Sequence, residues 1–222
     1  MKKKNVLTAA LALSVAAILA VGGSLAYFTD KDAKENVFTV GDVEIQLDEN
    51  YEEDSKLYPG AEKDAVTKEV DVTNIGSENA YVRVHIAVPS ALDANGYIHL
   101  LRNESSWAWE AGTYTTKIGD LNYNVYVATY QEALAAEEQT KEHALNSVYM
   151  DKKVTNEIIK ELEKAGVITA TQPDAQRRLN IQVMAEGVQE AGFETAGAAA
   201  AFEAALPYSA DSNPFIGYKA IN

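Results

Sequence analysis

Few side chains in this sequence could carry out catalysis. The chain has 222 residues, no cysteine and three histidines, His85, His99 and His143. The lack of cysteine excludes disulfides, thiolate nucleophiles and sulfur-ligated metals. No His-Glu-x-x-His motif occurs, and the histidines lie too far apart in sequence to form a local zinc pair. We interpret each as an ordinary surface or edge residue, with a site assembled from distant residues left open.

The other residue types that support chemistry form no recognisable motif. Acidic residues cluster at 30–32 and 48–54, without the glycine and the bidentate glutamate of a calcium loop, so a solvated face is favoured. No Gly-x-Ser-x-Gly, P-loop or Gly-x-Gly-x-x-Gly occurs. Trp107, Trp109 and 12 tyrosines could line a sugar-binding surface, although packing on sheets is more common for aromatic residues. We therefore assign no catalytic residue, no metal ligand and no cofactor.

The start of the chain is typical of a substrate for a signal peptidase. Three lysines, Lys2–Lys4, precede the apolar stretch Val6–Val21, which is shorter than the roughly 20 residues of a spanning helix. Small residues follow, with Ser24 at position −3 and Ala26 at position −1 of a cut that makes Tyr27 the first mature residue. The prediction is a cleaved leader that is in the membrane only before cleavage; a retained anchor is the alternative.

Charge limits the partners of the mature chain. Without residues 1–26 and their three lysines, 16 basic residues face 33 acidic ones, a formal charge of −17. Phosphate binding depends on clustered Lys and Arg, so nucleic acid is excluded as a partner, and so is adsorption to anionic lipid. The excess of negative charge is consistent with a soluble protein outside the cell.

The hydrophobic pattern predicts short strands at fairly even spacing, with helices late in the chain. The predicted strands are Asn36–Leu47, Val66–Thr73, Ala80–Val88, Tyr97–Arg102, the Trp107/Trp109 pair, Tyr123–Tyr130 and Leu179–Val188. The predicted helices are Gln131–Leu145, Thr155–Ala165 and Thr195–Leu206, and Asp48–Asp54 is predicted as a loop. In the clearest strand, Ala80–Val88, alternate residues from Val82 are expected in the core, with Arg83 and His85 on the outward face.

These elements favour a mainly β fold, an antiparallel two-sheet, jelly-roll-like sandwich with helical insertions behind a cleaved signal peptide. The predicted organisation is a signal peptide over 1–26, an amino-terminal segment over 27–38, and a domain over 39–222 with a helical insertion at about 131–178.

Several segments together resemble a known family. They are Gly22–Asp30 (GGSLAYFTD), Asn36–Gly41 with Val43–Ile45, Tyr58-Pro59-Gly60, Val70–Gly76, Ala80–Val84, and Ile181–Gln189 with Gly192-Phe193. In these residues the chain resembles the TasA/camelysin (CalY) family. The resemblance covers both ends of the chain and hardly any of 90–178.

The resemblance implies a secreted protein of a Gram-positive-type bacterium, in the extracellular matrix or at the cell surface, processed by a SipW-type signal peptidase. It further implies a jelly-roll subunit that polymerises with itself, and with accessory matrix proteins, into biofilm fibres. The mature amino-terminal segment is then expected to add as a strand to the next subunit, with Tyr27, Phe28, Val37 and Phe38 as its apolar side chains. The alternative is that 27–38 folds back on its own domain or stays disordered.

Two other functions remain open at this point. Relatives of camelysin are classed as metallopeptidases, so an atypical secreted metalloendopeptidase is one, although no zinc motif is present to carry over. The other is a monomeric adhesin or carbohydrate-binding sandwich that uses the aromatic residues near Trp107.

Overall fold

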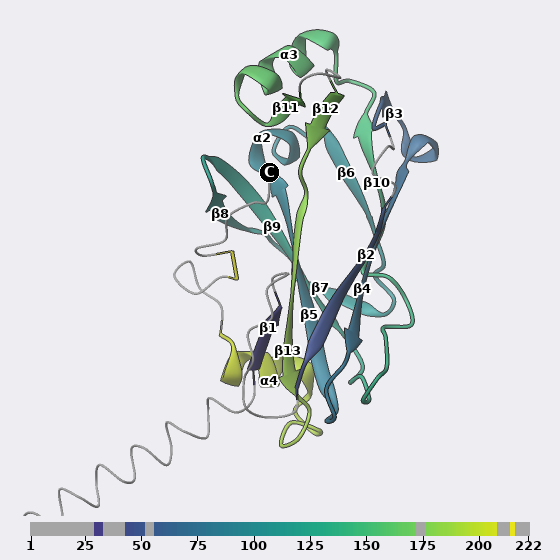
Figure 1. The fold of residues 1–222 in the computed structure, drawn as a ribbon, viewed down its shortest axis with the longest axis vertical. Helices are drawn as coiled ribbons and strands as arrows, with labels where there is room; N and C mark the ends of the chain where they lie inside the picture. The colour runs from purple at the N-terminus through teal and green to yellow at the C-terminus, as the bar shows by residue number, and fades with distance from the viewer. Residues whose placement is uncertain (1–28, 33–42, 52–55, 172–175, 208–213, 216–222) are drawn as a thin grey trace, which may run out of the picture.

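A computed structural model describes residues 29–32, 43–51, 56–171, 176–207 and 214–215 of the chain. Most strands belong to two sheets packed against each other, with helix α3 near one end and helix α4 near the other (Figure 1). The six-stranded sheet, sheet A, has the order β1-β13-β5-β9-β7, with β8 also paired to β9. Its strands are β1 (Thr29–Asp32), β13 (Gln182–Gln189), β5 (Ala80–Pro89), β9 (Leu121–Tyr130), β7 (Trp107–Trp109) and β8 (Tyr114–Ile118).

The five-stranded sheet, sheet B, has the order β2-β4-β10-β3, with β6 also paired to β10. Its strands are β2 (Ile45–Tyr51), β4 (Val66–Asn74), β10 (Leu145–Asp151), β3 (Pro59–Gly60) and β6 (Ile98–Arg102). Apart from the parallel β10–β3 pair, the pairings within the two sheets are antiparallel. The prediction of a mainly β, largely antiparallel two-sheet sandwich is confirmed, while the predicted signal peptide lies outside the described residues.

Short helices and one small hairpin complete the described fold. They are α2 (Ser90–Asp93), α3 (Asn156–Lys164), α4 (Gly197–Ala205), the 3-10 turn η1 (Glu62–Asp64) and the hairpin of β11 (Ile168–Thr171) with β12 (Gln176–Leu179). In the part of the chain that the structure covers, no helix is long and apolar enough to cross a membrane.

The main core lies between the sheets, where the inward face of β5 meets sheet B. The packed side chains are Val82, Val84, Ile86 and Val88 of β5 with Ile45, Val70 and Val72 of sheet B. Burial of each aliphatic side chain of this size stabilises a fold by roughly 1.5–3 kcal/mol, which makes this layer the main source of stability.

The opposite face of β5 is buried as well, which the sequence interpretation missed. Tyr81, Arg83, His85 and Ala87 are each at most 5% exposed, so the prediction of His85 as a surface or edge residue is wrong. Two further apolar clusters cover this outer face of sheet A, one around Phe215 and one around α4. Sheet A is therefore packed on both sides, and its polar side chains must find partners inside the protein.

Local composition misled the prediction in two segments. The predicted loop at Asp48–Asp54 is wrong for Asp48–Tyr51, which continue β2 in register with β4. The predicted helix at Gln131–Leu145 is wrong because this segment pairs its backbone with β4. The N–H of Thr140 donates to the carbonyl of Val72 at 2.9 Å, and that of Ala144 to the carbonyl of Val70 at 2.8 Å. Backbone pairing to a neighbouring strand overrides the helix propensity of alanine and glutamate.

The remaining elements follow the sequence more closely. Strands β4, β5, β6, β7 and β9 and helices α3 and α4 lie where they are predicted, within a few residues. The predicted cap of α3 is present, since Thr155 Oγ1 accepts a hydrogen bond from the N–H of Ile158 at 3.4 Å. The strand predicted at Leu179–Val188 corresponds to β13, whereas β8, β10 and the β11–β12 hairpin were not predicted.

At Gly187 the two sheets lie in close contact. It lies in β13, and a Cβ atom at this position would be 2.8 Å from Cγ2 of Ile45 and 3.3 Å from Cγ1 of Val43. These contacts come from the start of β2 and the residues just before it, so only glycine leaves room for β2 to cross β13.

We expect Gly187→Ala to lower the free energy of unfolding by about 1–3 kcal/mol, the usual cost of overpacking a filled site. Chemical denaturation of the two proteins measures the difference. Gly112→Ala is the matched control, because a Cβ at Gly112 meets no atom within 4 Å and its φ is not positive. Equal losses in both variants would contradict the assigned contact.

Candidate functional site

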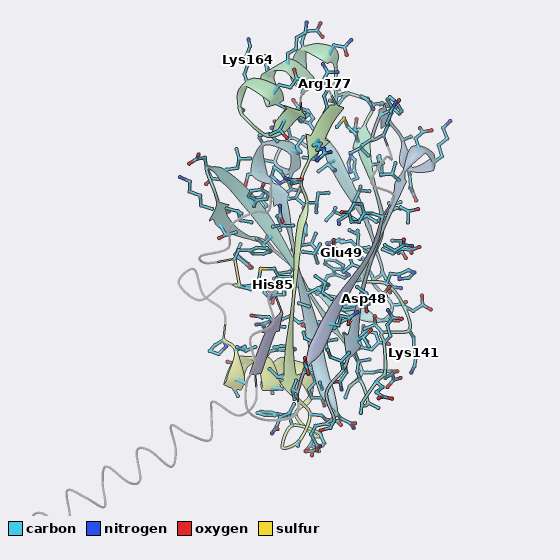
Figure 2. All side chains as sticks on the ribbon, in the orientation of Figure 1. Asp48, Glu49, His85, Lys141, Lys164 and Arg177 are labelled. Carbon is cyan, nitrogen blue, oxygen red and sulfur yellow. The ribbon has the colours of Figure 1, made fainter. Side chains whose placement is uncertain are left out.

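The three histidines lie in three separate places. His85 is in β5 on the outer face of sheet A, at the centre of the molecule in Figure 2. His99 of β6 pairs with Asp151 at 3.0 Å and stacks on Tyr149. His143, in the segment beside β4, pairs through Nδ1 with Asp71 at 2.7 Å. The fold does not bring these side chains together.

A metal ion is the group that a metallopeptidase would need, and the described side chains do not fit one. No set of three or more His, Asp or Glu side chains within the described ranges could hold a metal ion. Around His143 the reason is visible, since Nδ1 faces Asp71 and Nε2 lies 3.7 Å from Glu69. These groups pair with one another instead of converging on a common point, and we derive no metal-dependent step from them.

The most unusual polar group in the described structure is the buried network of Arg83, Glu186 and His85. One oxygen, Oε2 of Glu186, accepts hydrogen bonds from Arg83 Nε at 2.8 Å and from Arg83 Nη2 at 2.5 Å. The same oxygen lies 3.0 Å from Nε2 of His85. The other ring nitrogen of His85, Nδ1, lies 3.1 Å from the hydroxyl of Tyr114. Glu186 and His85 are 1% and 0% exposed, so this network is shielded from water.

Adjacent strands position the network. β13 pairs with β5, which puts Glu186 directly opposite Arg83, with His85 two residues further along the same face of β5. Tyr114 reaches the ring of His85 from β8. Sequence analysis found Arg83 and His85 only as outward residues, and it did not single out Glu186. One sequence signal could have indicated that this face is buried: on the outer face of β5, Tyr81 and Ala87 flank the two polar side chains.

Electrostatics fixes the charges in this network. Burial lowers the pKa of His85, although Glu186 partly opposes that shift, so the ring is neutral near neutral pH. Burial alone would raise the pKa of Glu186, but hydrogen bonds from His85 and Arg83 and the Arg83 charge, joined by the charge of His85 once acid protonates it, outweigh burial and lower the pKa to about 2. Because His85 is neutral, the Arg83 guanidinium supplies the compensating charge. Arg83 and Glu186 thus form the ion pair of the network, and the charge of Glu110 also acts on His85.

Arg83 also connects the network to the carboxyl-terminal helix. Its Nη2 donates to the carbonyl of Leu206 at 2.8 Å, and its guanidinium carbon lies 4.3 Å from the centre of the Phe202 ring. Leu206 is the residue after the last turn of α4, and Phe202 is its buried aromatic side chain. Arg83 thus joins sheet A, Glu186 and α4.

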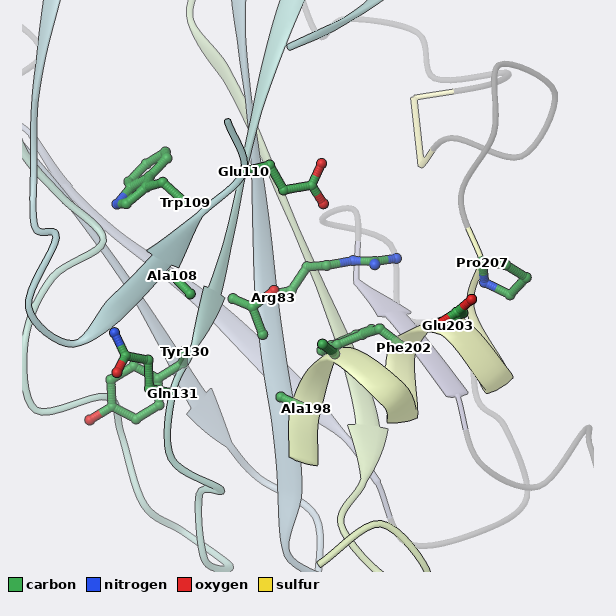
Figure 3. A pocket seen from close by; sticks show the side chains of 12 residues that line it. Arg83, Ala108, Trp109, Glu110, Tyr130, Gln131, Ala198, Phe202, Glu203 and Pro207 are labelled. Carbon is green, nitrogen blue, oxygen red and sulfur yellow. The ribbon is translucent and has the colours of Figure 1, made fainter. Parts of the chain in front are cut away.

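A groove of about 630 Å³ opens beside Arg83, between α4 and strands β7 and β9 (Figure 3). Figure 3 shows the Arg83 side chain extending between Glu110 and Phe202. The groove is lined by Arg83, Ala108, Trp109, Glu110, Thr129, Tyr130, Gln131, Ala198, Ala199, Phe202, Glu203 and Pro207. Arg83 itself forms part of the wall of this groove.

The aromatic pair near Trp107 is used inside the fold. Trp107 is 1% exposed, and its indole N–H donates to the carbonyl of Glu142 at 2.8 Å. The indole N–H of Trp109 donates to the carbonyl of Asn103, and Arg102 lies over its ring. Trp107 therefore does not form an exposed platform for a sugar.

The second candidate site is the edge of sheet A where β1 pairs with β13. Thr29–Asp32 run antiparallel to β13, in register from Thr29 opposite Val188 to Asp32 opposite Ala185. Within one chain, these four residues of the predicted amino-terminal segment thus pair with the chain's own sheet. The predicted cleavage residues Ser24, Ala26 and Tyr27 and the predicted donor side chains Phe28, Val37 and Phe38 lie outside the described residues.

Glu186→Leu should lower the free energy of unfolding by roughly 3–5 kcal/mol, because it leaves the Arg83 guanidinium buried without its counter-charge. The double variant Arg83→Met with Glu186→Leu should lose less, since it removes both charges. Denaturation at neutral pH measures both. Glu104→Gln serves as the control, because it breaks only the exposed Arg102–Glu104 pair, and we expect little change. A Glu186→Leu variant as stable as this control would contradict the analysis.

Acid should destabilise the folded protein. The folded-state pKa values of His85 and Glu186 lie below those of the unfolded chain, so unfolding takes up protons as the pH falls. The contribution of His85 to the free energy of unfolding is present above about pH 6.5 and is lost below it. The contribution of Glu186 is lost between about pH 4.5 and 2. For Glu186 the loss amounts to roughly 3 kcal/mol. Denaturation curves from pH 7 to pH 3 test this, and stability that stays constant or rises would contradict it.

Comparison with known proteins bears on the amino-terminal part of the chain. Residues 1–89 match the family model described as camelysin metallo-endopeptidase. No curated protein and no solved structure shows significant similarity to the chain. The match ends with β5, so β13, α4 and the rest of the fold lie outside it. The match over residues 1–89 supports the predicted resemblance to the TasA/camelysin family in this part of the chain.

Proposed function

We propose that this protein is a secreted structural subunit of extracellular fibres, in a biofilm matrix or at the cell surface, which polymerises by donating its amino-terminal strand. The observation that supports this most directly is the pairing of β1 with β13 at the edge of sheet A. An edge that accepts this strand from its own chain can accept the same strand from a neighbouring molecule.

The edge needs a strand for a physical reason. β13 has β5 on one side and β1 on the other, so removal of β1 leaves one row of its N–H and C=O groups unpaired. β1 is only four residues long, which limits the free energy that holds it in place within the monomer. Exchange for the equivalent strand of another copy reproduces the same hydrogen bonds and costs little.

Strand donation leads to a filament because donor and acceptor are different surfaces. Each subunit would give residues 27–38 to one neighbour and accept the same segment from another, a heterologous contact that does not close on itself. In this proposal Tyr27, Phe28, Val37 and Phe38 supply the apolar side chains of the donated segment. A SipW-type signal peptidase would release the segment by cutting after Ala26, and secretion would then place the subunits outside the cell.

Deletion of residues 27–38 should abolish fibres. Protein that begins at Tyr27 is expected to form fibres visible by electron microscopy as its concentration rises, and protein that begins at Thr39 is expected to remain monomeric. Circular dichroism and denaturation of the shortened protein show whether it is folded. Fibres of equal length from both proteins would refute the proposed role of the segment.

Folded subunits without residues 27–38 should also cap growing fibres, since they can accept a strand but cannot donate one. Added in increasing amounts to protein that begins at Tyr27, they should shorten the fibres progressively. Amino-terminal sequencing of secreted protein supplies the remaining test, because material that begins at Met1 would exclude strand release by cleavage after Ala26.

A second candidate function is a metalloendopeptidase of the camelysin type, which the description of the matching family favours. Casein cleavage by zinc-loaded protein, abolished by a chelator, would support it. The protein that begins at Thr39 separates the two functions, because it should lose fibres under the first proposal and need not lose peptidase activity under the second.

A further inference from the structure

We propose that copies of this protein meet end to end, with a basic lobe of one subunit docked on an acidic loop end of the next. The basic lobe consists of α3, the β11–β12 hairpin and the turn before them, over the described residues 152–171 and 176–179. The acidic loop end consists of the connections 75–79, 131–141 and 190–196. The inference rests on the proposed self-association and adds the surfaces that meet.

The register of sheet A places these two surfaces at opposite ends of the molecule. The three connections meet where β5 begins, because Ala80 donates its N–H to the carbonyl of Leu134 and Glu190 donates its N–H to that of Asn79. The lobe directly precedes β13, which runs antiparallel to β5, so it lies beyond the other end of β5 (Figure 1). The ten residues of β5 separate the two surfaces by about 30 Å, at about 3.3 Å per residue.

The lobe is opposite in charge to the rest of the mature chain. Within its described residues six basic side chains face three acidic ones, a formal charge of +3. All six are exposed, and within the described part of the chain only Arg177 forms an ion pair, with Glu163. They are Lys152, Lys153, Lys160, Lys164, Arg177 and Arg178. Outside residues 152–179 the mature chain has 10 basic and 29 acidic residues.

The loop end carries the complementary charge. Its three connections contain six glutamates and one lysine, Lys141, which pairs with Glu132 at 2.9 Å. The glutamates are Glu78, Glu132, Glu137, Glu138, Glu190 and Glu194. Burial, and after it the charges of Glu190 and Glu194, raise the pKa of the nearby Tyr81 hydroxyl. Carboxylates gathered in this way repel one another, and a neighbouring surface of opposite charge relieves that repulsion.

The direction of β1 leads to the same arrangement. β1 runs antiparallel to β13, from Thr29 at the loop end of sheet A to Asp32 nearer the lobe. A donated β1 therefore leaves its acceptor towards the lobe of that acceptor. The donor's own fold resumes at Val43, which lies beside Gly187 at the loop end. The loop end of the donor thus faces the lobe of the acceptor.

The length of the connecting chain fits this stacking. Asp32 and Val43 are eleven residues apart, and a chain of that length spans at most about 36 Å. About 20 Å of it covers the six residues from the level of Ala185 back to Leu179, where the hairpin begins. The remaining span of roughly 15 Å is close to the length of the four-residue strands of the hairpin. The donor's loop end therefore reaches the outer end of the acceptor's lobe.

Carbodiimide cross-linking of protein that begins at Tyr27 tests the contact, because it joins a lysine amine to a carboxylate without a spacer. We expect mass spectrometry to find links from Lys160 and Lys164 to Glu137. Each such link must join two subunits, since about 30 Å of β5 separates these residues within one. Raising NaCl from about 0.05 M to about 0.5 M should lower the yield at least about fivefold, because salt screens exposed charges. Absence of these links at low salt would overturn the proposal.

Charge reversal at each end gives a sharper test. One variant reverses three basic residues of the lobe: Lys152→Glu, Lys160→Glu and Arg178→Glu. The other reverses three glutamates of the loop end: Glu78→Lys, Glu137→Lys and Glu194→Lys. Each variant alone has like charges on its two surfaces, so the yield of links from Lys164 to Glu138, which neither variant alters, should fall at least about fivefold. An equal mixture brings opposite charges together again and should restore it; a mixture no better than the separate variants would refute the docking.

Glu62→Lys with Asp120→Lys is the control. Both residues are exposed and lie outside the two surfaces, in η1 and in the turn between β8 and β9, so this variant should give as many links as the unmodified protein. A loss as large as in the loop-end variant would overturn the proposal. Cross-linking of the unmodified protein requires no substitution, so it can refute the docking even if a variant does not fold.

Electron microscopy of the same samples separates this inference from the proposed fibre. Fibres that form without links between lobe and loop end would overturn the docking and leave strand donation in place. Links without fibres would support the docking and contradict the strand-mediated fibre.

Discussion

The burial of β5 on both faces is the constraint on which the rest of the described structure depends. Its inward valines and isoleucine join the two sheets into a sandwich, a common arrangement for an antiparallel sheet. Its outward face carries Arg83 and His85, which cannot be buried without partners. Glu186, Tyr114 and α4 supply these partners, so the second layer over sheet A is largely a consequence of what β5 carries on that face.

Adjacent residues of β13 perform different structural tasks. Glu186 turns its side chain to the outer face and neutralises Arg83. Gly187 has no side chain, and this lets Ile45 of β2 approach closely. Along the same stretch the backbone pairs with β1 on one side and β5 on the other. β13 is thus held in place by β5, β2 and the buried network, independently of the four residues of β1.

The sequence predicted the strands whose apolar residues alternate, and it failed where tertiary contacts outweigh local preference. Val82 to Val88 identify β5 from period alone, and Thr155 with Gly166 predict the limits of α3. The alanines and glutamates of Gln131–Leu145 favour a helix, yet the backbone of this segment forms hydrogen bonds with β4 instead. The buried network could not be predicted from the sequence, because Arg83 and Glu186 are 103 residues apart and only the β5–β13 register brings them together. The cover over the outer face comes from α4 and Phe215, whose contact with β5 no local pattern indicates.

The two strands that pair at the edge of sheet A differ in their relation to the family match. Residues 1–89 include β1, β2, β4 and β5, whereas the strand that receives β1 is β13 and lies far outside the match. The amino-terminal strand and part of the core, including Ile45, Val72 and Val84, therefore come from the matched residues, and they meet a partner strand nearly one hundred residues further along. A β13 that must pair with β1, make room for β2 and neutralise Arg83 has little freedom to vary.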